Sequence, residues 1–191
     1  MVSREKTEQV RQQIIIAIDN LLYQKGFNLM SFSDIAEASD VPRGNIYYYF
    51  KTKDEVLEAV IEYRIEQMQR MLADWNKNIK SPLDRLKRYA KIPFNEIDNI
   101  TRFGCPIGSL NTELGKSQHD LQLVSRRQYD TFLDWLKQQF REMVPEKNAH
   151  NLAMHLLVLT QGLVVIAQSY EDKKLVRREI KTIENWLESL L

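Results

Sequence analysis

The segment from Ser31 to Lys53, SFSDIAEASDVPRGNIYYYFKTK, constrains the fold most, because it has the pattern of two short helices joined by a tight turn. Ser31 can cap the first helix, since its hydroxyl accepts a hydrogen bond from a free backbone N–H. Asp40 stands where the chain must reverse, and Asp tolerates left-handed backbone angles better than most residues. Pro42 suits the first position of the second helix, where its missing N–H costs nothing. The segment therefore predicts a helix-turn-helix.

The second helix of this motif is rich in groups that can contact DNA. Ile46 and Phe50 are four residues apart and point inward as one stripe. This leaves Arg43, Asn45, Tyr48 and Tyr49 on or near the outward side. An arginine can donate two hydrogen bonds to guanine, an asparagine can bond a base edge, and a tyrosine ring can contact a thymine methyl group. A helix with this outward face can enter a major groove.

Further DNA contacts are expected around this helix. A lysine at the start of the following helix adds charge near the phosphates, and a serine near the start of the first motif helix can bond a phosphate. The three consecutive tyrosines could instead pack in a core, but consecutive helical residues span about 200° of arc, so not all three can be buried. The predicted contacts are Ser33, Pro42, Arg43, Gly44, Asn45, Tyr47, Tyr48, Tyr49 and Lys53.

Composition points to helices and to a reducing compartment. The 191 residues include only six glycines and five prolines, while Leu, Ile, Lys, Glu and Gln are abundant. Cys105 is the one cysteine, so no internal disulfide can form, which fits the cytoplasm. No signal peptide or amphipathic leader is apparent. The net charge is +1, so any basic surface for DNA must come from the placement of charges.

Apolar spacing predicts further helices along the rest of the chain. They cover about residues 5–25, 53–78, 118–143, 151–168 and 175–191, and another begins at Pro82 and is kinked or ended at Pro93. Residues 102–115 hold three glycines and a proline and are expected to be the least regular part.

The two C-terminal helices differ in pattern. Residues 151–168 are apolar nearly all round, but Asn151, His155 and Gln161 interrupt the run, so a helix buried on several sides fits better than a membrane span. The last helix has a single stripe of apolar residues at spacings of three and four. The pair either forms an interface with another subunit or completes the core of its own chain.

Catalysis and metal binding have little support. His150 and His155 are five residues apart, which does not place two ligands on one helix face. The sequence has no Gly-rich phosphate loop, no CxxC pair and no serine nucleophile elbow. We therefore expect no enzyme, no metal site and no cofactor.

The order of residues in the motif also resembles the signature of the TetR (tetracycline-repressor-like) family. The residues that match are Ile35-Ala36, Val41, Gly44, Ile46-Tyr47, Tyr49-Phe50, Lys53 and Leu57. Ser39-Asp40 stands where the family usually has Ala-Gly, and Tyr49 where it commonly has His.

The resemblance implies a mostly bacterial, all-α regulator of about nine helices. Its head, residues 1–53, would be a three-helix DNA-binding domain, and residues 54–191 would bind an effector and dimerise. Such a repressor binds a double-stranded operator as a homodimer, through a four-helix bundle of the two C-terminal helices of each subunit. A small-molecule effector releases it. The alternative is a helical protein-interaction module whose helix-turn-helix binds no specific DNA.

The resemblance also implies an effector pocket between the inner helices. Residues expected to line it are Trp75, Phe94, Phe103, Cys105, Asn111, Tyr129, Phe132 and Gln161, which are otherwise ordinary core residues. Gly104-Cys105, Gly108 and Glu113-Leu114 resemble family members that sense electrophiles or oxidants through the cysteine. The alternative is an inert thiol that behaves as a small hydrophobic residue.

Overall fold

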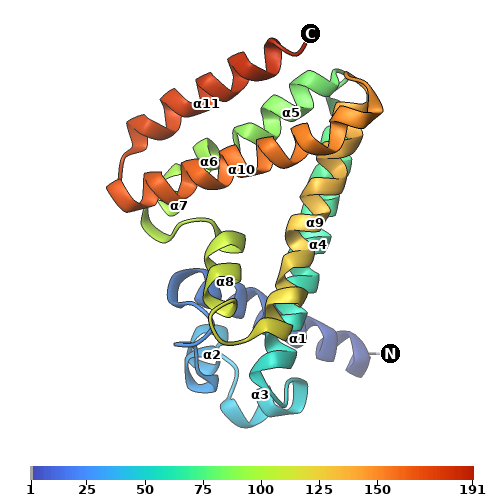
Figure 1. The fold of residues 1–191 in the computed structure, drawn as a ribbon. Coiled ribbons are helices and arrows are strands. Elements are labelled where there is room, and N and C mark those ends of the chain that lie inside the picture. The colour runs from blue at the N-terminus through green and yellow to red at the C-terminus, as the bar shows by residue number, and fades with distance from the viewer. Residues whose placement is uncertain (1) are drawn as a thin grey trace. The chain divides into compact units, whose positions relative to one another are not determined.

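The computed structural model describes the backbone of residues 2–191 and the side chains from residue 4 onward, and within that range every regular element is a helix (Figure 1). The described residues form eleven helical segments, so the chain is all-α as the sequence predicts. They are α1 (Val2–Lys25), α2 (Phe32–Ser39), α3 (Arg43–Tyr49), α4 (Lys53–Asn78), α5 (Pro82–Ala90), α6 (Ile92–Asn95), α7 (Ile97–Phe103), α8 (Pro106–Leu114), α9 (His119–Arg141), α10 (Glu146–Tyr170) and α11 (Lys173–Glu188).

The chain forms two compact units. The N-terminal unit comprises the residues up to Glu66 together with Ser109–Gln128, and the C-terminal unit comprises Gln67–Gly108 and Tyr129–Leu191. Helices α4, α8 and α9 each contribute residues to both units. The predicted boundary between a DNA-binding domain, residues 1–53, and an effector-binding domain, residues 54–191, is a division by function. These compact units do not test it, so it stays a prediction.

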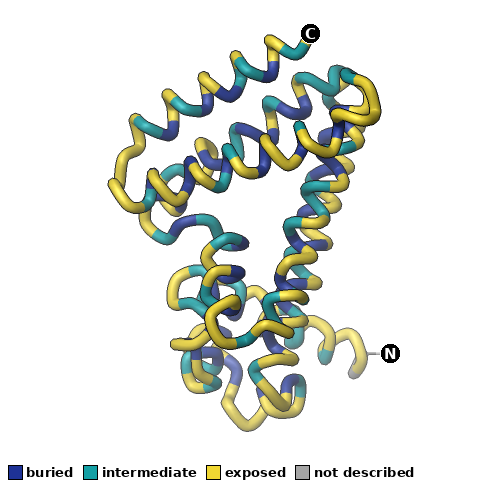
Figure 2. Tube along the Cα trace, in the orientation of Figure 1, coloured by how far each residue is buried: buried dark blue, intermediate teal, exposed yellow. Residues whose placement is uncertain are grey.

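The N-terminal unit is organised around aliphatic side chains from its helices. Ile18 of α1, Ile35 of α2, Ile46 of α3 and Leu57 of α4 are completely buried in one cluster. Figure 2 colours buried positions along the chain dark blue and exposed positions yellow. Burial of each such side chain contributes about 1.5–3 kcal/mol. This core holds α2 and α3 against α1 and the start of α4.

Local capping fixes the beginning of α2 as the sequence predicts. The Asp34 N–H donates to Ser31 Oγ at 3.2 Å, and the Ser31 N–H donates to Asp34 Oδ2 at 2.8 Å, which completes a capping box. A hydrogen bond from Lys25 and others from Ser31 hold the pKa of Asp34 far below its usual range. These contacts fix where α2 begins.

The turn between α2 and α3 matches its prediction except at one position. Asp40 adopts the left-handed conformation with a φ of 53°. Pro42 lies at the N-cap of α3 rather than at its first helical position, because its ψ of 136° is still extended. Its ring fixes a φ near −65°, which suits either position.

The C-terminal unit has its own core. Leu86 of α5, Leu136 of α9, Leu156 of α10 and Leu187 of α11 are completely buried in one cluster. The apolar stripe predicted for the last helix supplies Val176, Ile180, Ile183 and Leu187, all of which are buried. Pro93 lies in the short helix α6, which follows α5 after one turn residue, so the predicted interruption is present.

The prediction that residues 102–115 are irregular is wrong. Helix α7 ends at Phe103, helix α8 runs from Pro106 to Leu114, and only Gly104, Cys105 and Gly115 lie outside helices. Pro106 is compatible with a helix start, where its missing N–H is not needed. Gly108 lies within α8, and a Cβ at this position would lie only 2.8 Å from Gln161 Oε1. The glycine therefore permits close packing rather than breaking the helix.

Helix α10 is longer than predicted and is not buried on several sides within one chain. Its buried residues lie on one face, whereas Val158, Val165 and Ile166 are exposed. Among the described residues it is also the one helix long and apolar enough to cross a membrane, a test that core helices pass too. Val158 and Ile166 also line the groove described below.

Candidate nucleic-acid interface and regulatory cluster

Helix α3 presents polar and aromatic side chains to solvent. Arg43, Gly44 and Asn45 are exposed, and Tyr48 is 71% exposed. The opposite side of the helix carries Ile46, which is completely buried. The core thus holds α3 so that its donors and rings face outward.

Arg43 lies at the centre of a surface cluster. Its Nη1 donates to Ser33 Oγ at 3.3 Å and its Nη2 donates to Tyr47 Oη at 3.3 Å. The guanidinium lies over the Tyr47 ring, 5.8 Å from the centroid, and that ring stacks on Phe32 at 4.7 Å. These contacts orient a planar cation, which can exchange its exposed hydrogen bonds for those of a phosphate or a base.

The remaining predicted DNA contacts differ in their surroundings. Pro42 is exposed at the N-cap, while Tyr49 is partly buried against the apolar core and its ring meets Tyr48 edge-on at 5.1 Å. Lys53 Nζ donates to the carbonyl oxygen of Phe27 at 2.7 Å and lies 4.6 Å from the centroid of that ring. No local sequence pattern indicates this contact, since Phe27 is 26 residues away from Lys53.

Four of the predicted effector residues gather in the C-terminal unit. Tyr129 Oη donates to Gln161 Oε1 at 2.9 Å, and the Phe132 ring meets Tyr89 edge-on at 5.1 Å. Cys105, which is partly exposed, lies within electrostatic range of the phenols of Tyr89 and Tyr129. We call Cys105, Tyr89, Tyr129, Phe132 and Gln161 the regulatory cluster.

The phenols of this cluster remain protonated over the physiological pH range. Burial raises the pKa of Tyr89 well above its usual value, and a hydrogen bond with Thr160 opposes this only in part. Burial also raises the pKa of Tyr129, and the nearby Cys105 adds to the shift. Because both phenols are neutral, the cluster can donate and accept hydrogen bonds without presenting a charge of its own.

The other predicted effector residues lie in different surroundings. Trp75 is buried against Trp135, with ring centroids 5.8 Å apart. Phe94 is exposed and lies beneath the guanidinium of Arg177, and Phe103 lies beneath that of Arg102. Asn111 belongs to the N-terminal unit, where its Nδ2 donates to Ser125 Oγ at 3.0 Å.

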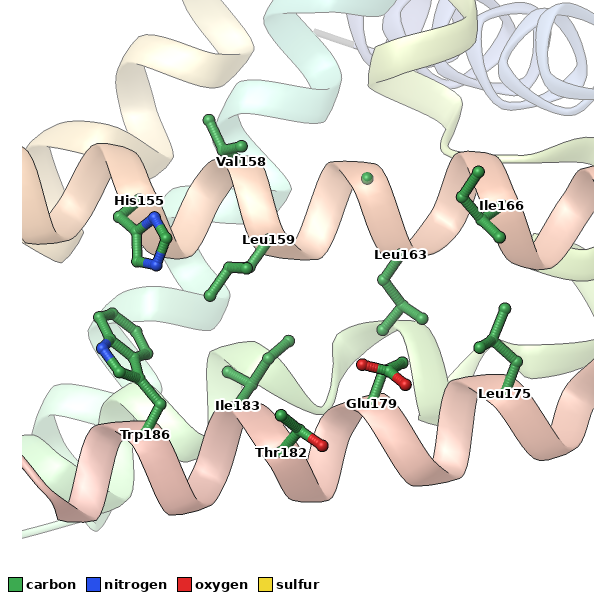
Figure 3. Close-up of a pocket in the computed structure, with 11 residues that line it drawn as sticks. His155, Val158, Leu159, Leu163, Ile166, Leu175, Glu179, Thr182, Ile183 and Trp186 are labelled. Carbon is green, nitrogen blue, oxygen red and sulfur yellow. The ribbon is translucent and has the colours of Figure 1, made fainter.

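A groove runs along α10 and α11 in the C-terminal unit (Figure 3). It has a volume of about 590 Å³, and its lining residues include Val158, Leu159 and Ile166 of α10 and Trp186 of α11. Figure 3 shows Leu159 and Leu163 pointing toward α11, and the His155 ring meets Trp186 edge-on at 5.0 Å. The all-round apolar pattern of residues 151–168 was the sequence signal for this surface.

The part of the chain that the structure describes contains no candidate metal site. Its His, Cys, Asp and Glu residues form no group of three or more that could hold an ion.

Comparison with known proteins places this architecture in context. Residues 14–60 match the model of the bacterial regulatory proteins of the tetR family. A helix-turn-helix transcriptional regulator encoded in the lacX 3′ region of Lactococcus lactis is 30% identical over 114 residues, which cover 59% of this chain but only 58% of that protein. A regulator of the same type from Mycobacterium tuberculosis is 22% identical over 183 residues, 91% of this chain and 93% of that protein.

Solved structures share the fold over nearly the whole chain. The crystal structure of a TetR-family transcriptional regulator from Cytophaga hutchinsonii superposes with a TM-score of 0.83 at 18% identity, and the match covers 96% of each chain. The matched helix-turn-helix contains the outward face of α3, and the relatives are named as transcriptional regulators rather than enzymes. Residues 14–60 thus match the tetR family of bacterial regulatory proteins, and the chain as a whole shares the fold of a TetR-family transcriptional regulator.

Proposed function

We propose that the protein is a cytoplasmic, homodimeric repressor that binds a palindromic operator and is released from it by a chemical signal. The outward face of α3 carries this proposal. It combines an oriented guanidinium, an exposed amide and an exposed tyrosine on a helix whose other side is locked in a core. Groups of these kinds form hydrogen bonds with the edges of guanine and adenine, and with the phosphates that position a protein on the duplex.

The exposed face of α10 supports a homodimer. Met154, Val158, Gly162 and Ile166 recur at every fourth position, so they lie on one side of the helix, and Val158 is 58% exposed. An apolar surface of this kind marks an interaction site. A second copy would cover it with its own α10 and α11. Two α3 helices could then read half-sites about 34–36 Å apart.

The regulatory cluster supports sensing in the C-terminal unit. Its neutral phenols and amide suit an uncharged effector with polar groups, and the partly exposed Cys105 suits an electrophile or oxidant. In either case the signal lowers operator affinity only if it favours a different separation of the two α3 helices. The loss of operator affinity therefore cannot exceed the difference between the signal's affinities for the operator-binding arrangement and for the other arrangement of the two α3 helices.

Selection of bound sequences from a random DNA pool at near-physiological salt tests the proposal. We expect an imperfect palindrome to be enriched by the wild-type protein. A matched variant with Arg43, Asn45 and Tyr48 all replaced by Ala should enrich none, while its helical content is unchanged. Failure of the wild-type protein to enrich any sequence would favour an interaction module that keeps the helix-turn-helix for packing. The enriched DNA then provides a probe for candidate effectors and thiol reagents.

A further inference from the structure

The loop between α1 and α2 is held by side chains from distant parts of the chain. The N–H of Phe27 donates to Glu113 Oε2 at 3.0 Å, and the N–H of Asn28 donates to Glu113 Oε1 at 2.7 Å. The carbonyl oxygens of the same two residues accept from Lys53 Nζ, at 2.7 and 3.3 Å. Two successive residues are thus bound through both their N–H and their carbonyl groups.

A second observation shows how closely the carboxylate fits this loop. Gly26 has a φ of +80°, and a Cβ at that position would lie 2.8 Å from Glu113 Oε2. A side chain there would therefore be strained and would displace the carboxylate. Gln118 adds a further contact, since its Nε2 donates to the Asn28 side-chain oxygen at 3.1 Å.

The loop controls how the helix-turn-helix is presented. It joins the end of α1 directly to Ser31, the N-cap of α2, and the buried Phe27 anchors it in the core of the N-terminal unit. Helix α3 follows α2 after a short turn, so a shift of the loop also shifts the DNA-reading face. Glu113 lies on α8, which begins directly after Cys105. Glu113 therefore holds the loop from within the N-terminal unit, across 85 and 86 positions of the sequence.

We propose that Glu113 is a positioning residue for operator binding: its carboxylate fixes the α1–α2 loop in the conformation that presents α3 to the major groove. The inference rests on the proposed DNA-binding function. It requires no contact between Glu113 and DNA, because the carboxylate acts through the backbone of Phe27 and Asn28.

The sign of the expected effect distinguishes this role from simple electrostatics. Removing a carboxylate lowers the negative charge of the protein, which by itself strengthens binding to the polyanionic DNA backbone. A positioning role predicts the opposite for the operator. In Glu113→Gln the amide nitrogen cannot accept from a backbone N–H, so one of the two hydrogen bonds to the loop is lost and the other is no longer made to a charged group. The loop can then adopt conformations other than the one that binds the operator.

The test compares the full-length wild-type protein with Glu113→Gln and with Asp120→Asn, an exposed control that makes the same charge change on α9. Affinities are measured for the selected operator and for a random duplex of equal length at one salt concentration. We expect Glu113→Gln to weaken operator binding about tenfold and to leave random-duplex binding equal or slightly tighter. Asp120→Asn should weaken neither. Hydrogen exchange of the Phe27 and Asn28 amides should accelerate only in Glu113→Gln.

Operator affinity and loop exchange in Glu113→Gln that match those of Asp120→Asn would overturn the proposal. If Glu113→Gln fails to fold, Gln118→Ala serves instead, since it changes no charge and should weaken operator binding about threefold with faster exchange at Asn28. An unchanged operator affinity in that variant would also contradict the proposal. If the wild-type protein selects no operator, the proposed function fails, whereas the exchange measurement still decides whether Glu113 fixes the loop.

Discussion

Helices α3 and α10 both expose large side chains, but of different chemical kinds. On α3 the exposed large side chains are Tyr47 and Tyr48, and Arg43 and Asn45 of the same helix are also exposed. All four side chains carry hydrogen-bonding atoms. On α10 the exposed groups form a mainly aliphatic stripe, which contains Val158, Val165 and Ile166. A polar nucleic acid suits the first surface, and a second apolar protein surface suits the other.

The difference also appears in how each helix is held. Helix α3 has seven residues and contributes one completely buried side chain, Ile46, so its position depends on neighbouring helices and on the α1–α2 loop. Helix α10 has 25 residues and buries eight of them. Small changes around α3 can therefore displace it, whereas α10 is held in place by its own extensive packing.

The largest expected effect comes from placing a charge on the aliphatic face of α10. Val158→Glu should convert the dimer into a monomer, because a carboxylate cannot be buried in an apolar interface without a partner. Operator affinity should then fall by roughly 100-fold, since each α3 would bind its half-site alone. Analytical ultracentrifugation and operator binding measure the two effects.

The control for this substitution is Gln69→Glu, which introduces the same charge at an exposed position of α4, outside the apolar face of α10. It should remain dimeric and bind the operator. A dimeric Val158→Glu protein would mean that copies of the chain associate through another surface. The exposed apolar face of α10 would then not be the dimer interface.

The next effect concerns sequence reading by α3. Arg43→Ala should cost about 1–3 kcal/mol at the base position that the guanidinium reads, and should relax the preference there, because a bidentate contact to guanine is lost. Competition binding with single-base operator variants measures this. Equal losses on the operator and on random DNA would instead assign Arg43 to the phosphate backbone.

A smaller effect should follow from loss of the cap at α2. Ser31→Ala removes the hydroxyl that accepts from the Asp34 N–H and should lower the free energy of unfolding by about 1 kcal/mol. Urea denaturation measures the loss, and Ser33→Ala, two residues further along, should cost less. Dimerisation should be unchanged in both variants, since neither residue lies on α10 or α11; a weaker dimer would show that the head and the interface are not independent.

The smallest effect is expected at Gly162 and has opposite signs in monomer and dimer. Apart from the backbone of α10 itself, none of the described residues lies within 4 Å of a Cβ at this exposed position. Gly162→Ala should therefore stabilise α10 by up to about 1 kcal/mol in the monomeric Val158→Glu background. In the dimer, the added methyl group should weaken association if a partner helix packs closely there. Thermal unfolding and the dimer dissociation constant measure the two effects, and a tighter dimer would rule out close packing over Gly162.

Most of the helices were predictable from local patterns, but helix α8 was not. The cap at Ser31 and the left-handed Asp40 depend on neighbours within four residues, so their roles are evident in the sequence. Helix α8 was missed because glycine and proline lower local helix propensity. Its Gly108 is explained by Gln161, a residue 53 positions away, whose side chain occupies the space where a Cβ would lie.

The candidate site was predictable to a similar degree. Residues of α3 could be assigned to an outward face because helical periodicity alone places Ile46 inward. The effector residues could not be assigned individually, since an aromatic residue on an inner helix looks the same whether it packs in a core or borders a site. The structure gathers Cys105, Tyr129, Phe132 and Gln161, but it places Asn111 in the other unit.

The sequence by itself determined that this protein is all-α, that it contains a helix-turn-helix, and which side chains of that motif face outward, because these properties arise from short-range periodicity and capping. Only the tertiary structure decided that Glu113 holds the α1–α2 loop and that Lys53 binds the same two residues from the other side. These contacts join residues 25 to 86 positions apart. They depend on how whole helices pack, which no local pattern specifies.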